Sequence, residues 1–244
     1  LRAAVGIGAV SSDRAQRRGM LAAINAALDK VTPIGVDFGA LGLTSITVAL
    51  SYGRDSDPGG PKTTDLVFDR DHASSRQFSA FLNASLDTSY RYRIEYNFAA
   101  AGPWHAHEVS YTFSGETDDR TLELDPSRYL GFLQVSVEPV GIDAEAVSFT
   151  DVQLTYQDDD GWAQRTTLVV KADSPAQLWQ VRTPARSQPA FTYQFVHTLS
   201  DGSVVTTEPV TTSSTRVPVV DPFPGRLDIS ITPAWDPAAV RTVL

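Results

Sequence analysis

The sequence predicts a mostly β protein, in which two tandem antiparallel seven-stranded β-sandwiches are preceded by one amphipathic α-helix. The first observation is residues 90–98, where apolar and polar side chains alternate with the period of two of a half-buried strand. The second is the return of that pattern at residues 191–199, since 191 minus 90 and 193 minus 92 both give 101. The third is the chain after Pro33, where short alternating stretches are separated by glycine, proline and aspartate turns.

The N-terminal segment, residues 1–32, carries the helical pattern. Asp13 is a good N-cap residue, and Gln16 follows at the spacing of a capping box. An isolated helix of this length is marginal in water, so its apolar face must be buried on its own domain, between two domains or against a partner. The spacing predicts a helix over residues 13–30, with a partner-facing side made of Met20, Leu21, Ile24 and Leu28 that continues to Val31.

Internal similarity divides the rest of the chain into two repeats. Residues 33–37, with the pattern Pro-x-Gly-x-Asp, recur at 139–143, and 139 minus 33 is 106. Residues 133–139 recur at 227–233, and 227 minus 133 is 94. Loop shortening produces an offset that shrinks between strands and holds within them when a packed core is kept.

Each repeat is expected to supply seven strands. The first repeat spans residues 33–138 and the second 139–244, and Thr63-Thr64 of one aligns with Thr166-Thr167 of the other. Short alternating strands without helices are typical of an antiparallel β-sandwich. The expected strands are 43–52, 63–69, 76–83, 89–98, 108–114, 120–125 and 131–138, then 147–156, 164–172, 177–183, 190–199, 203–208, 214–220 and 226–232.

Two such sandwiches in tandem resemble immunoglobulin-like or fibronectin type III-like modules. The resemblance covers residues 33–244 and lies in the architecture, that is, in short alternating strands and the turns between them. It departs from true immunoglobulin domains, because the chain contains no cysteine and therefore no cysteine pair. The resemblance implies a β-sandwich fold and carries no functional residue over to this chain.

Charge and composition argue against several classes of function. The net charge is −9, and an acidic chain argues against nucleic acid or anionic lipid as the main partner. No apolar run is long enough for a membrane span. The absence of cysteine removes disulfides, thiolate nucleophiles and thiolate zinc sites. The chain begins with Leu1 rather than Met, which suggests a processed or excised piece of a longer protein, and an extracellular or cell-surface location is favoured.

The most prominent chemical cluster is the stretch Trp104-His105-Ala106-His107-Glu108. Two histidines at this spacing share one face of a strand and could hold a metal ion. However, no third ligand is identifiable, and the corresponding turn of the second repeat, Asp201-Gly202-Ser203, has no histidine. We therefore expect neither a metal site nor a cofactor.

Tryptophans near loops provide the candidate binding residues. Trp104 and Trp162 lie at or beside loop tips, where exposed rings can stack on sugars or anchor a protein partner. The alternative is that each ring closes the end of its own core. The predicted binding set is Trp104, His105, His107 and Trp162.

No catalytic residue is assigned. The sequence has no nucleophile-elbow motif, phosphate loop or dinucleotide fingerprint. His197 takes the place of Tyr96 at an inward strand position, which favours a core histidine with satisfied hydrogen bonds. Glu95 and Glu108 are the candidates for a pair of glycosidase carboxylates, since such a pair is defined in space rather than in sequence.

The leading hypothesis is a non-catalytic tandem β-sandwich segment of a larger surface or multi-subunit assembly protein, acting as a spacer and protein–protein interaction module. The alternative is a carbohydrate-binding or adhesive module that uses loop aromatics, and a hydrolase is a third class. A catalytic site is usually single, whereas the residues shared by the two repeats are strand and turn residues. The expected partners are another protein or further subunits, with a carbohydrate as the alternative.

Overall fold

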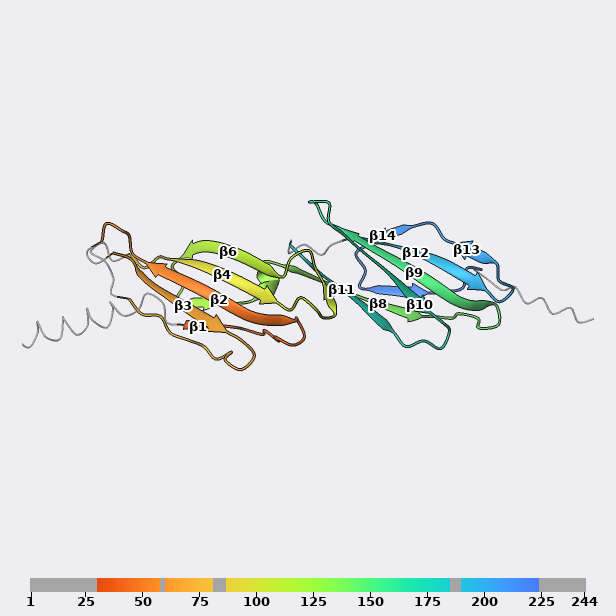
Figure 1. Ribbon diagram of the computed structural model, residues 1–244, viewed down its shortest axis with the longest axis horizontal. Coiled ribbons are helices and arrows are strands. Elements are labelled where there is room, and N and C mark those ends of the chain that lie inside the picture. The colour runs from red at the N-terminus through yellow and green to blue at the C-terminus, as the bar shows by residue number, and fades with distance from the viewer. Residues whose placement is uncertain (1–29, 58–59, 81–86, 185–189, 224–244) are drawn as a thin grey trace, which may run out of the picture.

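The computed structural model describes residues 30–57, 60–80, 87–184 and 190–223, and this part of the chain is mostly β-structure (Figure 1). The only helix in it is the three-residue 3₁₀ helix η1 (Pro126–Arg128), and no described helix is long and apolar enough to cross a bilayer. Residues 1–29 of the predicted N-terminal helix, including its face of Met20, Leu21, Ile24 and Leu28, lie outside the described residues.

The C-terminal end of that helical prediction is wrong. Residue 30 begins a strand, β1 (Lys30–Thr32), and Val31 is fully buried within it. A valine three positions after Leu28 fits a helical stripe, but a β-branched residue two positions before Pro33 fits a strand equally well. The N-terminal unit therefore begins before the proline that the sequence marks as its start.

A four-stranded antiparallel sheet forms the centre of the N-terminal unit, and Ile46 and Ile94 are fully buried on its apolar face. The rest of this core comes from irregular segments, which supply Phe38, Phe78 and Leu130, and from a short parallel pair of β1 with β7 (Thr121–Glu123). The order of the sheet is β3 (Lys62–Phe68), β2 (Leu43–Tyr52), β4 (Tyr90–Phe98) and β6 (Ser110–Thr117).

The second layer of this unit is smaller than the predicted seven-stranded sandwich requires. The expected strand at 76–83 is reduced, within the described residues, to one bridge between Arg76 and Val31, and the expected strand at 120–125 is the three-residue β7. Phe78 and Ala80 are buried at alternate positions, so the alternation read from the sequence is real. A strand also needs a partner along its edge, and β1 offers three residues.

Two sheets make up the C-terminal unit and share one core. Buried residues of both, such as Val152 and Val181, belong to one cluster, so the sheets pack face to face. The first sheet has the order β10 (Ala163–Val170), β9 (Val147–Gln157), β12 (Phe191–Leu199) and β13 (Val204–Thr206), and β14 (Val210–Thr212) also pairs with β12. The second has the order β15 (Arg216–Val219), β8 (Gly131–Pro139), β11 (Gln177–Thr183) and β5 (Trp104–His105).

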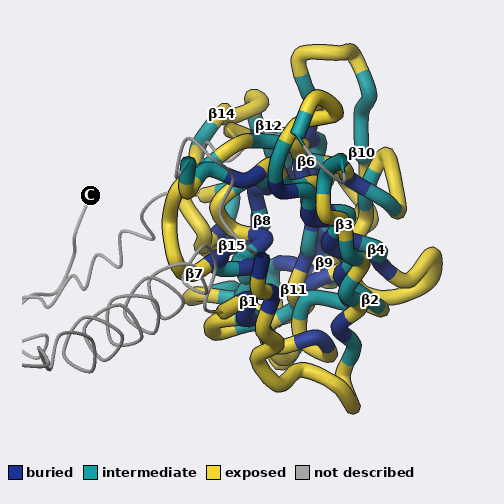
Figure 2. The backbone as a smooth tube through the Cα atoms, turned by 90° about the vertical axis from the view of Figure 1, so that its left-hand side faces the viewer, coloured by how far each residue is buried: buried dark blue, intermediate teal, exposed yellow. Residues whose placement is uncertain are grey.

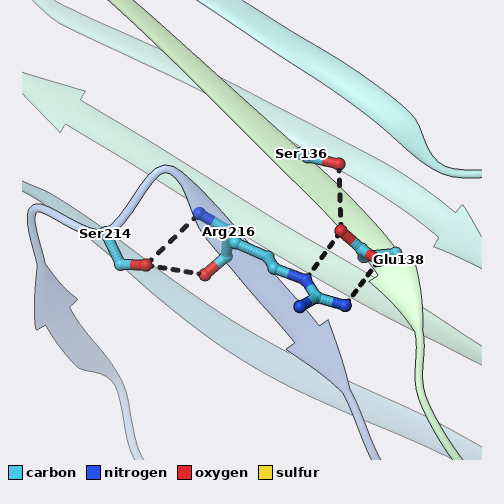
Figure 3. Close-up of polar contacts among 4 residues, drawn as sticks. All are labelled: Ser136, Glu138, Ser214 and Arg216. Carbon is cyan, nitrogen blue, oxygen red and sulfur yellow. Dashed lines mark hydrogen bonds and ion pairs between the residues drawn. The ribbon is translucent and has the colours of Figure 1, made fainter.

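Strand β8 contributes to the C-terminal core, although the sequence places residues 131–138 at the end of the first repeat. It pairs antiparallel with β11 and parallel with β15, and Leu133 and Val137 are buried in the second cluster. Arg216 of β15 donates two hydrogen bonds to the Glu138 carboxylate, at 2.8 and 2.9 Å, across the parallel strands (Figure 3). Alternation identifies this strand, but it does not tell which of two cores the apolar face joins.

The central strands of the two units pair in the same register. Leu50 of β2 lies opposite Tyr92 of β4 in the first unit. Leu154 of β9 lies opposite Tyr193 of β12 in the second. The neighbouring order is also the same, because β3-β2-β4 corresponds to β10-β9-β12.

The strand pairing matches β3 with β10 one position away from the match that the sequence repeat predicts. Leu50 pairs with Thr64, and Leu154 pairs with Thr166. The alignment of Thr63 with Thr166 is therefore wrong. The hairpin loops before β3 and β10 differ in length, and residue identity alone does not locate where the extra residues were added.

The inward face predicted for residues 90–98 is confirmed, with Tyr92 partly buried against the same core. In β12, Phe191 and Phe195 are buried and Tyr193 is partly buried against the second core, whereas Leu199 is partly buried at the point where the register with β9 shifts. The buried members of the two predicted faces are Tyr90, Ile94, Tyr96, Phe98, Phe191 and Phe195.

The two units lie end to end along the long axis of the molecule (Figure 1). Seen along that axis, buried residues occupy the middle of the section, and exposed residues form the surrounding loops (Figure 2). The first core ends at Leu130 and the second begins at Leu133, with Phe132 packed against the first. The chain therefore passes from one core to the other within a few residues.

Candidate functional site

Trp104 and His105 lie where the N-terminal unit meets the C-terminal unit. They form β5, which pairs in parallel with Gln180 and Val181 of β11. A segment between two strands of the first sheet thus becomes the edge strand of a sheet in the second unit. Trp104 Nε1 donates a hydrogen bond of 2.8 Å to the Ala40 carbonyl, so this residue is tied to the first unit by its ring and to the second by its backbone.

His107 and Trp162 also meet at this junction. Their rings stack with centroids 5.7 Å apart and planes 9° from parallel. Trp162 is held from its own side by the ring of Tyr156, edge-on at 6.1 Å, and by a 2.8 Å hydrogen bond from its backbone N–H to Asp158 Oδ1. These contacts favour packing over an exposed sugar-stacking platform, because one face of the indole is already covered.

Of the predicted binding set, Trp104, His107 and Trp162 make ring contacts at this junction, whereas His105 is exposed. Trp104 meets the ring of Phe132 edge-on, with centroids 5.3 Å apart. Within the described residues, no three histidine, aspartate or glutamate side chains are arranged to hold a metal ion. The aromatic residues of this stretch thus serve contacts between the two units.

Arg182 is the residue of the junction that the sequence did not reveal. It is 2% exposed, and its guanidinium carbon lies 3.5 Å from the centre of the Phe98 ring and 5.9 Å from that of Tyr111. Burial lowers the pKa of Arg182, and the neighbouring Tyr111 opposes this shift. Its Nε atom has no hydrogen-bond partner in the described structure, so the flat cation is held by aromatic faces.

Strand alternation predicts an exposed position for Arg182. On β11 the inward positions are Trp179 and Val181, so Arg182 should face water. The observed strand is buried on both faces from residue 181 to residue 183, because the first unit covers the outer face there. A charged residue between Val181 and Thr183, both buried, carries no sequence signal for such a cover.

A groove of about 780 Å³ lies on the outer face of the first sheet. It crosses all four strands, and a smaller cavity of about 170 Å³ shares Ser51, Arg91 and Glu116 with it. No sequence motif indicates this groove, because its residues come from four strands that are separated in the chain. The lining consists of Ala49, Leu50, Ser51, Asp55, Pro61, Thr63, Asp65, Arg91, Tyr92, Arg93, Ser114, Gly115 and Glu116.

His197 has a structural role, as its inward strand position suggests. It is 1% exposed, and its Nδ1 shares a 2.8 Å hydrogen bond with Thr150 Oγ1. Burial lowers the pKa of His197, and the carboxylate of Asp221 opposes this shift. The expectation of a satisfied core histidine is confirmed.

No protein-family model and no curated protein sequence matches the chain. Among solved structures, the chain is similar to a putative adhesin from Bacteroides ovatus ATCC 8483, with 10% identity and a TM-score of 0.31, covering 84% of this chain and 93% of that one. It is also similar to a leucine-rich repeat protein from Bacteroides thetaiotaomicron VPI-5482, with 12% identity and a TM-score of 0.21, covering 78% of this chain and 26% of that one. Similarity at this level does not identify a family.

Proposed function

We propose that this chain is a non-catalytic two-unit segment of a larger surface or multi-subunit assembly protein, which holds its units at a fixed angle and acts as a spacer and protein–protein interaction module. The observation that carries this proposal is the junction, where β5 of the first unit completes a sheet of the second. A flexible linker would allow the units to move independently, whereas a shared sheet ties their orientations together.

Buried side chains support the same rigid junction. Arg182 of the second unit lies over Phe98 of the first, and a desolvated cation–π contact of this kind contributes about 2 kcal/mol or more. Trp104 and Trp162 add ring contacts from both sides. We place the division between the units after Leu130 rather than at residue 138, because the apolar residues of β8 pack in the second core.

We also propose that the two units are repeats of one immunoglobulin-like β-sandwich. The matching register of Leu50 with Tyr92 and of Leu154 with Tyr193 supports a common plan for the two units. The unequal second layers argue that one copy was modified more than the other. The apolar helix face predicted at Met20, Leu21, Ile24 and Leu28 is proposed as the contact with a protein partner or a further subunit.

Distances between the two units test the spacer role. The chain has no cysteine, so spin labels at Asp118→Cys and Val204→Cys report one distance without background. Double electron–electron resonance should give one narrow distance distribution. Arg182→Ala and Trp104→Ala should broaden it, because each removes a contact across the junction. Leu178→Ala, an exposed position on the same strand as Arg182, is the matched control and should leave the distribution narrow.

A broad distribution in the parent protein would refute the spacer role. It would mean that the two units reorient freely, and that the β5–β11 pairing opens in solution. Equal broadening by Leu178→Ala would show that any change in β11 loosens the junction, so the specific role assigned to Arg182 would fail.

A further inference from the structure

The groove on the first sheet has a floor made of two rows of side chains that run across the strands. In the first row Ala49 of β2 lies between Asp65 of β3 and Arg93 of β4, and Arg93 lies opposite Ser114 of β6. Residues directly opposite each other across neighbouring strands share one face of the sheet. The four side chains therefore line one surface, with a small residue at its centre.

The second row has the same design, with Ser51 of β2 between Thr63 of β3 and Arg91 of β4. Arg91 lies opposite Glu116 of β6 but donates its hydrogen bonds to Ser51 Oγ and the Gly53 carbonyl, at 3.4 and 3.2 Å. Asp55 adds a further carboxylate to the lining. The groove thus presents two guanidinium groups, three carboxylates and the hydroxyl groups of Ser51, Thr63 and Ser114 over a floor of small side chains.

These charged groups do not neutralise one another. Within the described residues, none of Asp55, Asp65, Arg91, Arg93 and Glu116 takes part in an ion pair. Asp65 and Arg93 are kept apart by Ala49, at about 10 Å or two strand spacings. Arg91 and Glu116 do lie directly opposite each other, a placement in which opposite charges stabilise a sheet, but Arg91 donates to Ser51 and Gly53 instead. Donors and acceptors therefore remain available to a ligand.

The second unit shows that the fold does not require this arrangement. In the same register, the position of Ala49 is occupied by Gln153, that of Asp65 by Thr167 and that of Arg93 by Gln194. The matching sheet face of the second unit is therefore uncharged at the positions of Asp65 and Arg93, and a longer side chain stands at the centre of its row. The opposite charges and the small central residue of this row are specific to the first sheet, whereas in the second row Ser51, Thr63 and Arg91 correspond to Thr155, Arg165 and Thr192.

The mixture of positive and negative side chains in the groove indicates which kind of ligand it can bind. Carboxylates and guanidinium groups side by side can accept from and donate to neighbouring hydroxyl groups in pairs. Three carboxylates repel an anion, and two guanidinium groups repel a cation. An extended peptide would need free backbone groups, but the backbone of the two central strands of this sheet is paired on both sides. A neutral polyhydroxylated chain is not repelled by either charge and does not need free backbone groups.

We propose that this groove binds a neutral oligosaccharide, held by hydrogen bonds from Arg91 and Arg93 and to Asp65 and Glu116. The small floor at Ala49 lets a sugar ring approach the sheet, and the volume of about 780 Å³ lies within the usual range of ligand pockets, roughly 300–1,000 Å³. This site is separate from the tryptophans at the junction and does not depend on the spacer role.

Nuclear magnetic resonance titration tests the proposal. The probes are maltotetraose, cellotetraose, mannotetraose and xylotetraose, with tetragalacturonate as an anionic probe and a peptide of alternating Lys and Glu as a mixed-charge probe. At least one neutral tetrasaccharide should produce saturable amide shifts confined to the groove strands, with a Kd of about 1 mM or tighter. The two charged probes should bind at least tenfold more weakly.

Variants then link the binding to the groove. Ala49→Gln copies the residue at the corresponding position of the second sheet, so it should fold, and it should raise the Kd at least tenfold by filling the floor. Arg93→Gln, which removes a charge without removing bulk, should do the same. Gln153→Ala on the second sheet is the matched control and should leave the Kd unchanged.

Three results would overturn the proposal. The first is the absence of saturable binding with every neutral probe, which would make the groove a solvated sheet face. The second is tighter binding of the mixed-charge peptide in the groove, which would make it a protein-docking surface. The third is a set of sugar-induced shifts centred on Trp104 and Trp162, which would move carbohydrate binding to the junction.

Discussion

At the scale of single residues, one buried position is filled differently in the two units. Tyr96 lies opposite Ile46 in the first sheet, and His197 lies opposite Thr150 in the second. The imidazole shares a hydrogen bond with Thr150, whereas the buried Tyr96 hydroxyl has no partner in the described structure. The histidine is satisfied because a threonine lies opposite it, where the first sheet has an isoleucine. Burial of the imidazole links its proton uptake to stability.

The pH dependence of unfolding tests this linkage. Burial holds the native pKa of His197 below its ordinary value of 6.5, so the unfolded chain takes up the proton first as the pH falls. The free energy of unfolding contributed by His197 should be constant above about pH 6.5 and should decline below it, until the native pKa is reached. His197→Asn removes this titration and should flatten the decline in urea titrations between pH 7.5 and pH 5.

The parent and His197→Asn share all other titrating groups, so the difference between their pH profiles isolates His197. Glu138, for example, has its pKa lowered by its hydrogen bonds with Arg216 in both proteins. Parallel profiles would mean that His197 titrates alike in the folded and unfolded states, which its burial should prevent.

At the scale of elements, the edge strand β6 is fitted closely to its neighbour β4. Gly115 of β6 lies opposite Tyr92, and a Cβ atom placed on Gly115 would be 2.5 Å from the Tyr92 hydroxyl oxygen and 2.7 Å from its Cζ. The Tyr92 ring in turn packs against the first core. Glycine is therefore required here by the space that a neighbouring ring occupies.

Replacing this glycine tests the fit between β4 and β6. Gly115→Ala should lower the free energy of unfolding by roughly 1–3 kcal/mol, because the Tyr92 ring must move out of a packed position. Gly102→Ala is the matched control, since no atom lies within 4 Å of the added methyl group, and its effect should stay within about 0.5 kcal/mol. Equal urea midpoints for the two variants would show that Tyr92 moves aside freely.

The limits of sequence prediction also appear at this scale. Alternation located the strands at 90–98 and 131–138, because a period of two identifies a strand and its buried face. The same pattern does not identify the strand's partner, so it could not assign β8 to the second core or show that β5 would pair with another sheet. The sequence identified Trp104 and Trp162 as candidates. It gave no signal for the burial of Arg182, because the face of β11 on which Arg182 lies is covered by residues distant in the chain.

The groove illustrates a further limit. Each of its charged residues reads as an ordinary solvated position on an alternating strand. Only the registers of β3, β2, β4 and β6 bring Asp65, Ala49 and Arg93 into one row. A surface that is built across strands has no continuous motif along the chain, and it becomes visible once the pairing is known.

At the scale of the whole molecule, three connections join the two cores at the junction. Strand β8 leads directly from one core into the other, β5 returns from the first unit to pair with β11, and Arg182 is buried over Phe98 between them. Together they should leave the two units with one fixed relative orientation in solution.

Residual dipolar couplings measure that orientation most directly. In a weakly aligned sample, backbone N–H couplings from residues 30–130 and from residues 131–223 should fit a single alignment tensor, with the same magnitude and the same principal axes for both units. Two tensors that differ in magnitude or direction would show that the units reorient independently, and that result would contradict the rigid junction on which the proposed spacer role rests.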